Sequence, residues 1–302
     1  MISDKRKASA LSHHSSLITH HLILMPKIQA GEIELYYEEH GAGDALVLIP
    51  GFSNGLWIWL KQIPAFSQKF RTITFDPRGI ARSASPDQAI SIRMIADDVA
   101  ALLAALKIER AHILGASFGG FVAQEFALGY PEMTRSLILC CTSFGGPRHI
   151  PPPMATLQAI ASTKGLNSDE RVRENLLLAF SQKYLEENRE EVEQLIALRA
   201  ANYVPEYAYT RQLQAAIAFN TEERVKEIKA PTLVITGDED IIVPSENSRN
   251  LAARIPNARL VIIKEGSHTF FIERAEEFNR AVTEFIKQSG VWSLESGVKG
   301  KN

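Results

Sequence analysis

Apolar and polar residues first alternate along this chain and then form continuous apolar runs. Residues 33–39 alternate with period two before Gly41 and Gly43, which predicts a half-exposed antiparallel strand. Residues 45–49 form a short apolar run, as is typical of a strand covered on both faces. Further runs of this character, each predicted to be a strand of one sheet, lie at 71–75, 111–114, 136–141, 232–236 and 259–263.

Helical periodicity separates these apolar runs. Between residues 92 and 106 the apolar positions recur at helical spacing, at Ile95, Val99, Leu102, Leu103 and Leu106. Residues 245–254 and 273–287 are also predicted to be helices. Because strands that alternate with helices pair in parallel, we expect the α/β class, with a mostly parallel central sheet flanked by helices.

A charge-rich helical segment interrupts this alternation. The strand pattern stops after Gly145-Gly146-Pro147 and returns near residue 230, and helices are predicted between, including 171–180 and 184–203. We therefore expect an inserted helical cap at 147–229 within a core formed by 25–146 and 230–290. The flanking segments are expected to be a disordered extension at 1–24 and a loosely ordered tail at 291–302.

Composition and charge narrow the function classes. The chain has 302 residues, 45% hydrophobic and 23% charged, which suits a globular core. Its 33 Lys and Arg against 35 Asp and Glu give a net charge of −2 without a basic block, so we expect no nucleic-acid partner. No segment reaches the roughly 18 to 20 apolar residues that span a bilayer, so no membrane partner is expected. Assembly with further copies of the chain stays open.

The cysteines indicate whether the protein works in a reducing or an oxidising compartment of the cell. The two cysteines of the chain, Cys140 and Cys141, are adjacent within a predicted buried strand. Such a pair is better suited to buried thiols than to a strained vicinal disulfide. A reducing compartment follows, and we expect a cytoplasmic location.

The motif Gly115-Ala116-Ser117-Phe118-Gly119 comes directly after a predicted strand and before a helical stretch. In this context Gly-x-Ser-x-Gly predicts a tight strand-to-helix turn, called the elbow below, that exposes the serine hydroxyl. The glycines stand where a larger side chain would collide with neighbouring backbone. The helix N-terminus places amide groups and a positive dipole end nearby. Ser117 is therefore the candidate nucleophile; the alternative is an inert serine in a packing turn.

A serine nucleophile requires a base, and the base requires an orienting carboxylate. His268 follows the last predicted strand, at the carboxyl end where α/β sheets carry their sites. Three acids follow the preceding strand, at Asp238, Glu239 and Asp240. We favour Asp240 because it is furthest from the strand and closest to the loop that must reach the histidine. The chain order is then Ser, Asp, His.

Acyl transfer also needs two amide donors that stabilise an oxyanion. One is expected from Phe118, directly after the nucleophile, and the other from the loop at 50–54 that follows the first core strand. Within this loop we favour Phe52, since Gly51 allows the turn that points its amide into the site. A plain β-turn is the alternative. No cofactor and no metal ion is expected.

Together with Asp76-Pro77-Arg78-Gly79 and Ser83, these motifs resemble the α/β-hydrolase superfamily over residues 26–289. The resemblance is to the bacterial branch with carboxylesterases, enol-lactone hydrolases such as 3-oxoadipate enol-lactonase, and meta-cleavage C–C hydrolases. It implies the α/β-hydrolase fold, in which the Asp-x-Arg-Gly signature braces the loops around the site. Pro50-Gly51 stands where many members have His-Gly, and Phe118 where lactonases often have Met. The elbow serine excludes epoxide hydrolases and haloalkane dehalogenases, which use aspartate there.

The resemblance implies a serine hydrolase that cleaves a carboxylic ester or lactone of a small substrate through an acyl-enzyme on Ser117. His268 is then the base, Asp240 its orienting acid, and Phe52 and Phe118 the oxyanion donors. C–C bond hydrolysis, acyl transfer or perhydrolysis on the same triad remain alternatives, as does a ligand sensor without turnover. Four cap residues could bind a substrate carboxylate or simply be solvated, namely Arg171, Arg173, Arg199 and Arg211.

Overall fold

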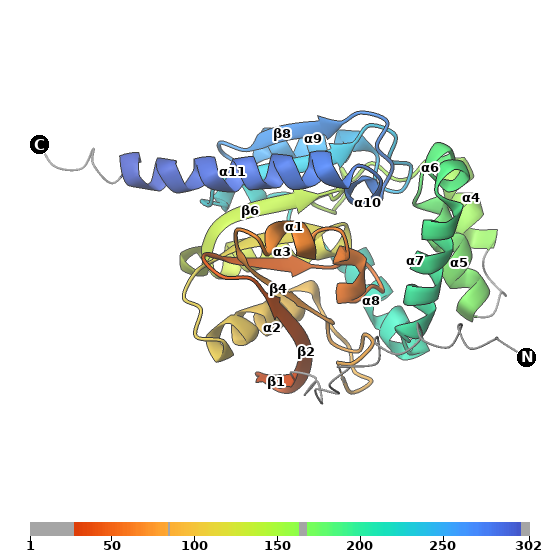
Figure 1. The fold of residues 1–302 in the computed structure, drawn as a ribbon, viewed down its shortest axis with the longest axis horizontal. Coiled ribbons are helices and arrows are strands. Elements are labelled where there is room, and N and C mark those ends of the chain that lie inside the picture. Colours follow the sequence, from red (N-terminus) through yellow and green to blue (C-terminus); the bar gives the residue numbers. More distant parts are fainter. Residues whose placement is uncertain (1–26, 84, 163–167, 297–302) are drawn as a thin grey trace, which may run out of the picture.

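The computed structural model describes residues 27–83, 85–162 and 168–296 (Figure 1). The expected extension at 1–24 lies outside them. The described chain contains a sheet of eight strands: β1 (Lys27–Ala30), β2 (Ile33–His40), β3 (Ala45–Ile49), β4 (Arg71–Phe75), β5 (Ala111–Ala116), β6 (Thr134–Cys140), β7 (Thr232–Gly237) and β8 (Arg259–Ile263).

The strand order across the sheet is β1-β2-β4-β3-β5-β6-β7-β8. The pairings β1–β2 and β2–β4 are antiparallel, and every pairing from β4 through β8 is parallel. The continuous apolar runs are the central strands, and β3, β5 and β7 are buried along their whole length. The α/β class and the mostly parallel sheet are therefore confirmed.

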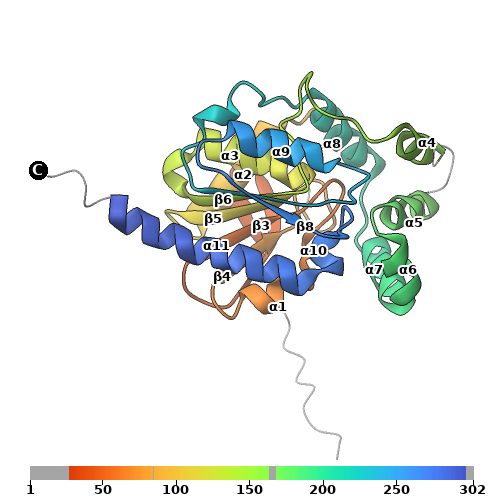
Figure 2. The same ribbon diagram turned by 90° about the horizontal axis from the view of Figure 1, so that it is seen from above.

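Helices cover both faces of the sheet (Figure 2). One face carries α2 (Ile92–Ala105), α3 (Phe118–Gly129) and α9 (Ser245–Arg254), and the other α1 (Ile63–Phe66) and α11 (Ala275–Ser296). The short α10 (Phe270–Glu273) precedes α11, and single 3₁₀ turns lie at Leu56–Trp59, Pro131–Met133 and Val225–Glu227. Two separate apolar clusters, one on each face, form the core.

Between β6 and β7 the chain forms α4 (Met154–Ser162), α5 (Ser168–Leu178), α6 (Gln182–Glu187), α7 (Arg189–Ala201) and α8 (Glu206–Ala218). In Figure 1, α4 to α7 stand beyond one end of the sheet, while α8 returns to the core. We call these five helices the cap.

The single helix predicted over 184–203 is wrong. The structure divides it at Asn188, which ends α6 and precedes α7 with non-helical angles of φ −126° and ψ 38°. The Asn188 side-chain amide donates to the Tyr184 carbonyl at 3.2 Å. Asparagine breaks helices in this way because its side chain competes for backbone groups.

The loosely ordered tail expected at 291–302 is also corrected. Helix α11 continues to Ser296, and residues 297–302 lie outside the described part. Gly290 does not end the helix, since one exposed glycine lowers helix stability by only about 1 kcal/mol relative to alanine.

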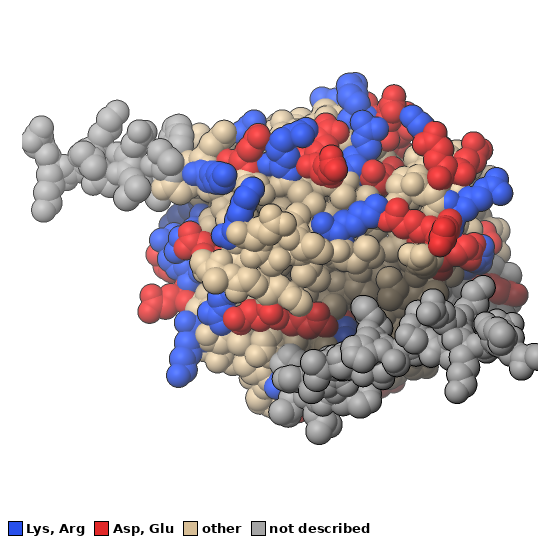
Figure 3. All heavy atoms as spheres, viewed as in Figure 1, with Lys and Arg blue, Asp and Glu red and all other residues tan. Residues whose placement is uncertain are grey.

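The surface adds two observations. Within the described ranges, no helix combines the length and the apolarity required to cross a bilayer. On the face in Figure 3, basic and acidic side chains are interspersed.

Candidate active site

Ser117 lies at the turn between β5 and α3 in a strained backbone conformation, with φ 53° and ψ −117°. Its amide donates to the Cys140 carbonyl at 2.8 Å, and its carbonyl accepts from the Thr142 hydroxyl at 2.8 Å. A non-glycine residue keeps such angles only where its surroundings over-determine them. Two contacts with the end of β6 therefore hold the predicted elbow in place.

The glycines of the motif allow close backbone approach. A methyl group on Gly115 would overlap the Gly119 carbonyl, whereas one on Gly290 would meet nothing within 4 Å. We expect Gly115→Ala to lower the free energy of unfolding by about 3 kcal/mol and the control Gly290→Ala to raise it by about 1 kcal/mol. Urea unfolding followed by circular dichroism measures both. Parent-like stability of Gly115→Ala would contradict this packing of the elbow.

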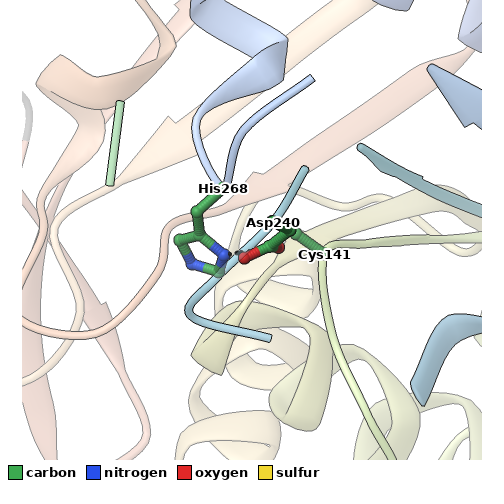
Figure 4. Close-up of side chains that lie close together, drawn as sticks. All are labelled: Cys141, Asp240 and His268. Carbon is green, nitrogen blue, oxygen red and sulfur yellow. Dashed lines mark hydrogen bonds and ion pairs between the residues drawn. The ribbon is translucent and has the colours of Figure 1, made fainter. Parts of the chain in front are cut away.

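His268 lies in the loop between β8 and α10, and its Nδ1 is 2.8 Å from Oδ2 of Asp240 (Figure 4). Asp240 is 5% exposed, and its Oδ1 accepts from the Ile242 and Val243 amides, each at 2.8 Å. The carboxylate is thus fixed on both oxygens, and it orients the imidazole.

The other two candidate acids point elsewhere. Asp238 binds Lys264 at 3.0 Å on the surface, and Glu239 is exposed. The geometry therefore selects Asp240 as the partner of His268, because the loop past β7 must turn before a carboxylate reaches the histidine.

The pKa of His268 reflects opposing effects. Burial lowers the pKa, but the charge of Asp240, the Cys141 group and the hydrogen bond to Asp240 outweigh it and raise the pKa to about 9. The neutral imidazole, which is the form that accepts a proton, therefore increases as the pH rises toward that value.

Cys141 flanks this pair (Figure 4). Within the described residues, Cys141, Asp240 and His268 form the one group of three or more potential metal-binding side chains. Burial, with a further contribution from Cys140, raises the pKa of the Cys141 thiol, so the thiolate that binds metals is disfavoured. The carboxylate and Nδ1 already bind each other. This arrangement suits an aspartate–histidine pair better than a metal ion.

The predicted oxyanion loop adjoins the elbow. A methyl group on Gly51 would lie 3.5 Å from the Ser117 Cβ, and the Phe52 and Phe118 rings contact edge to face with centroids 6.1 Å apart. Phe118 is the first residue of α3, where helix amides have no acceptor in their own helix. The two expected donors therefore come from neighbouring segments beside Ser117.

A cavity of about 430 Å³ lies between core and cap. Ser117 and His268 both line it, together with Phe52 from the core and Tyr209 from the cap. The volume lies within the range of about 300 to 1,000 Å³ that is typical of small-ligand pockets. The structure thus brings the predicted nucleophile and base to one cavity, and the predicted acid binds the base from behind it.

A family model described as the alpha/beta hydrolase fold matches residues 44–275. The chain belongs to the α/β-hydrolase family. A RutD protein of Azorhizobium caulinodans, whose name describes a carbamate hydrolase, is 30% identical over 261 residues, covering 86% of this chain and 98% of the relative.

Solved structures of the α/β-hydrolase family agree. An enol-lactonase from Burkholderia xenovorans has a TM-score of 0.77 at 26% identity, covering 87% of this chain and 100% of its own. A meta-cleavage product hydrolase from Pseudomonas fluorescens has a TM-score of 0.74 at 28% identity, covering 87% and 98%. The names of these proteins share hydrolysis and differ in the substrate, so they support a hydrolase without selecting the bond.

The Asp-x-Arg-Gly signature of this α/β-hydrolase braces loops, as the resemblance implied. Asp76 accepts from the Leu56 amide at 2.9 Å and from Arg82 Nε at 2.7 Å, and Arg78 donates to Asp98 at 2.6 Å. These contacts join the loop after β4 to the 3₁₀ turn at Leu56–Trp59, which follows the predicted oxyanion loop, and to α2.

The cap arginines differ in their surroundings. Arg173 pairs with Glu193 and Arg211 with Asp87 near the surface, and the Arg171 side chain lies outside the described part. Arg199 is instead 8% exposed and lines the cavity, so a solvated helix face does not describe it.

Sequence reasoning also missed Gln212, a buried cap residue whose side-chain oxygen accepts from the Ser53 amide at 2.8 Å. No local signal marks it, since the partners are 159 residues apart.

Proposed function

We propose that this α/β-hydrolase cleaves a carboxylic ester or lactone of a small substrate through an acyl-enzyme on Ser117. The observation that carries the proposal is the 2.8 Å contact of His268 with Asp240 on the cavity that Ser117 lines at its strained turn. A location in the cytoplasm is part of the proposal, and the two free, buried thiols are consistent with it.

In this mechanism, neutral His268 takes the Ser117 proton while the oxygen attacks the carbonyl carbon. The amides of Phe52 and Phe118 stabilise the oxyanion, and His268 then protonates the leaving alcohol as the acyl-enzyme forms. Water, deprotonated by His268, attacks the acyl carbon and releases Ser117 and the acid. Asp240 keeps the proton on Nδ1 and stabilises the imidazolium at each step.

The cavity supports a compact, mainly apolar substrate. Its cap wall includes Leu176, Leu178 and Leu213, and its one buried amide oxygen without a protein partner within the described residues is Oδ1 of Asn175. Such an acceptor orients a substrate donor, while the leucines bind hydrocarbon. Carbamates carry a comparable carbonyl, and the name of the RutD relative makes them the second substrate class to test.

The test is hydrolysis of p-nitrophenyl esters from acetate to laurate, with γ-lactones and a p-nitrophenyl carbamate in parallel. We expect saturable ester or lactone hydrolysis and one equivalent of phosphonate label on Ser117, found by peptide mass analysis. Lys69, which is exposed on the core and does not line the cavity, provides a Lys69→Met control that keeps both results. Carbamate turnover without ester turnover would replace the ester proposal. A protein that takes up no label and hydrolyses no substrate would overturn it.

A further inference from the structure

The cap holds the oxyanion loop through Ser53, which directly follows Phe52. Gln212 on α8 accepts a hydrogen bond from the Ser53 amide through Oε1 at 2.8 Å. Arg199 on α7 donates from Nη2 to the Ser53 hydroxyl at 2.8 Å. Ser53, Arg199 and Gln212 are 5%, 8% and 1% exposed, so water does not compete for these bonds. Two cap helices therefore bind one residue of the core loop.

A third cap contact reaches Phe52. The Tyr209 ring on α8 packs edge to face against the Phe52 ring, with centroids 4.9 Å apart. The Phe52 ring in turn contacts that of Phe118. Aromatic pairs in this geometry add about 0.5 to 1.5 kcal/mol beyond the area they bury. The cap thus packs against both the side chain of Phe52 and the peptide that follows it.

The backbone of the loop requires such support. Ser53 has a φ of 58°, which is unusual for a residue other than glycine and costs on the order of 1–3 kcal/mol. Its amide belongs to the same peptide unit as the Phe52 carbonyl, which accepts from Nδ2 of Asn54 at 3.2 Å. Gln212 and Asn54 therefore hold the two sides of one peptide plane. Because the Tyr209 ring also holds the Phe52 side chain, fixing this plane restricts ψ of Phe52, and with it the position of the Phe52 amide.

Arg199 also contributes its charge. Within the described residues no carboxylate forms an ion pair with it; its Nη1 donates to the Asn202 carbonyl at 3.0 Å. Burial lowers the pKa of Arg199 to about 10, with nearby Tyr209 acting in the opposite direction, so it stays cationic at neutral pH. A buried cation beside the oxyanion loop favours negative charge there.

We propose that the cap completes the oxyanion hole of this enzyme, with Arg199, Tyr209 and Gln212 as positioning residues that set the Phe52 amide. This inference rests on the proposed function. It assigns the cap a part in the chemical step besides forming the pocket. A substrate that binds between core and cap would then meet an aligned oxyanion hole only while these contacts are in place.

The test compares Gln212→Met, Arg199→Met and Arg199→Lys with the parent on the best ester. Loss of alignment acts on the transition state, so we expect kcat to fall about 10- to 100-fold in both Met variants while KM stays within about twofold. Affinity for a trifluoromethyl ketone, which forms an oxyanion on Ser117, should fall by the same factor as kcat. Arg199→Lys should recover part of the loss because it keeps the charge.

Lys183→Met is the matched control, since it removes an exposed charge from α6, and it should match the parent. Phosphonate titration counts competent sites, and urea unfolding separates stability from rate. If Gln212→Met does not fold, Gln212→Asn shortens the same side chain. Unchanged kcat per titrated site and unchanged ketone affinity would overturn this inference and leave the ester hydrolase proposal standing. If the parent protein showed no turnover and took up no label, the ester hydrolase proposal itself would be wrong.

Discussion

Replacing Ser117 by alanine is expected to lower kcat for ester hydrolysis by about 10⁶-fold, the loss found when a serine-protease nucleophile is removed. The strained turn presents the Ser117 side chain to the cavity, whereas the Ser53 hydroxyl on the same cavity is already bound by Arg199. KM should change little, since the methyl side chain leaves the cavity wall intact. Stopped assays at high enzyme concentration measure the residual rate.

Ser91→Ala is the matched control for this substitution. The Ser91 hydroxyl caps α2 by accepting from the Met94 amide at 3.1 Å, far along the chain from the elbow. We expect it to lose about 1 kcal/mol of stability and to keep the parental kcat. A Ser117→Ala protein that retains more than about a hundredth of the parental rate would contradict nucleophilic catalysis by Ser117.

Asp240→Asn is expected to lower kcat by about 10⁴-fold, because the amide stabilises the wrong imidazole tautomer and cannot stabilise its cation. It should also shift the pH profile. His268 acts as a base when neutral, and its pKa of about 9 places the rising limb of the parental kcat/KM near that pH. Without the Asp240 charge, burial dominates and lowers the pKa. The limb should therefore move to lower pH.

Asp238→Asn distinguishes the acids that follow β7. Its carboxylate binds exposed Lys264, so we expect parental kcat and an unchanged rising limb. Measurement of kcat/KM from pH 5 to 10 covers all three proteins. If Asp238→Asn were the slower variant, the assignment of the acid would have to be exchanged.

Local patterns were sufficient for most of the fold. The strands at 45–49 and 71–75 and the helix at 245–254 have the bounds that their apolar patterns predicted. A strand covered on both faces requires a short apolar run, and turn residues end it, so such boundaries can be recognised from a few neighbouring residues. The break at Asn188 and the continuation past Gly290 were missed because capping by a side chain competes with helix propensity by small energies.

The candidate site likewise contains residues that local sequence patterns predict and contacts that only the tertiary structure decides. Ser117, His268 and the acidic loop could be found from sequence, because each lies in a short motif directly after a strand and parallel strands end at one edge of the sheet. The sequence favoured Asp240, and the turn of the loop in space is what puts its carboxylate, rather than that of Asp238, against His268. The contacts of Ser53 with Arg199 and Gln212 join residues 146 and 159 positions apart. No local pattern records such contacts, since they arise only when the cap packs on the finished core.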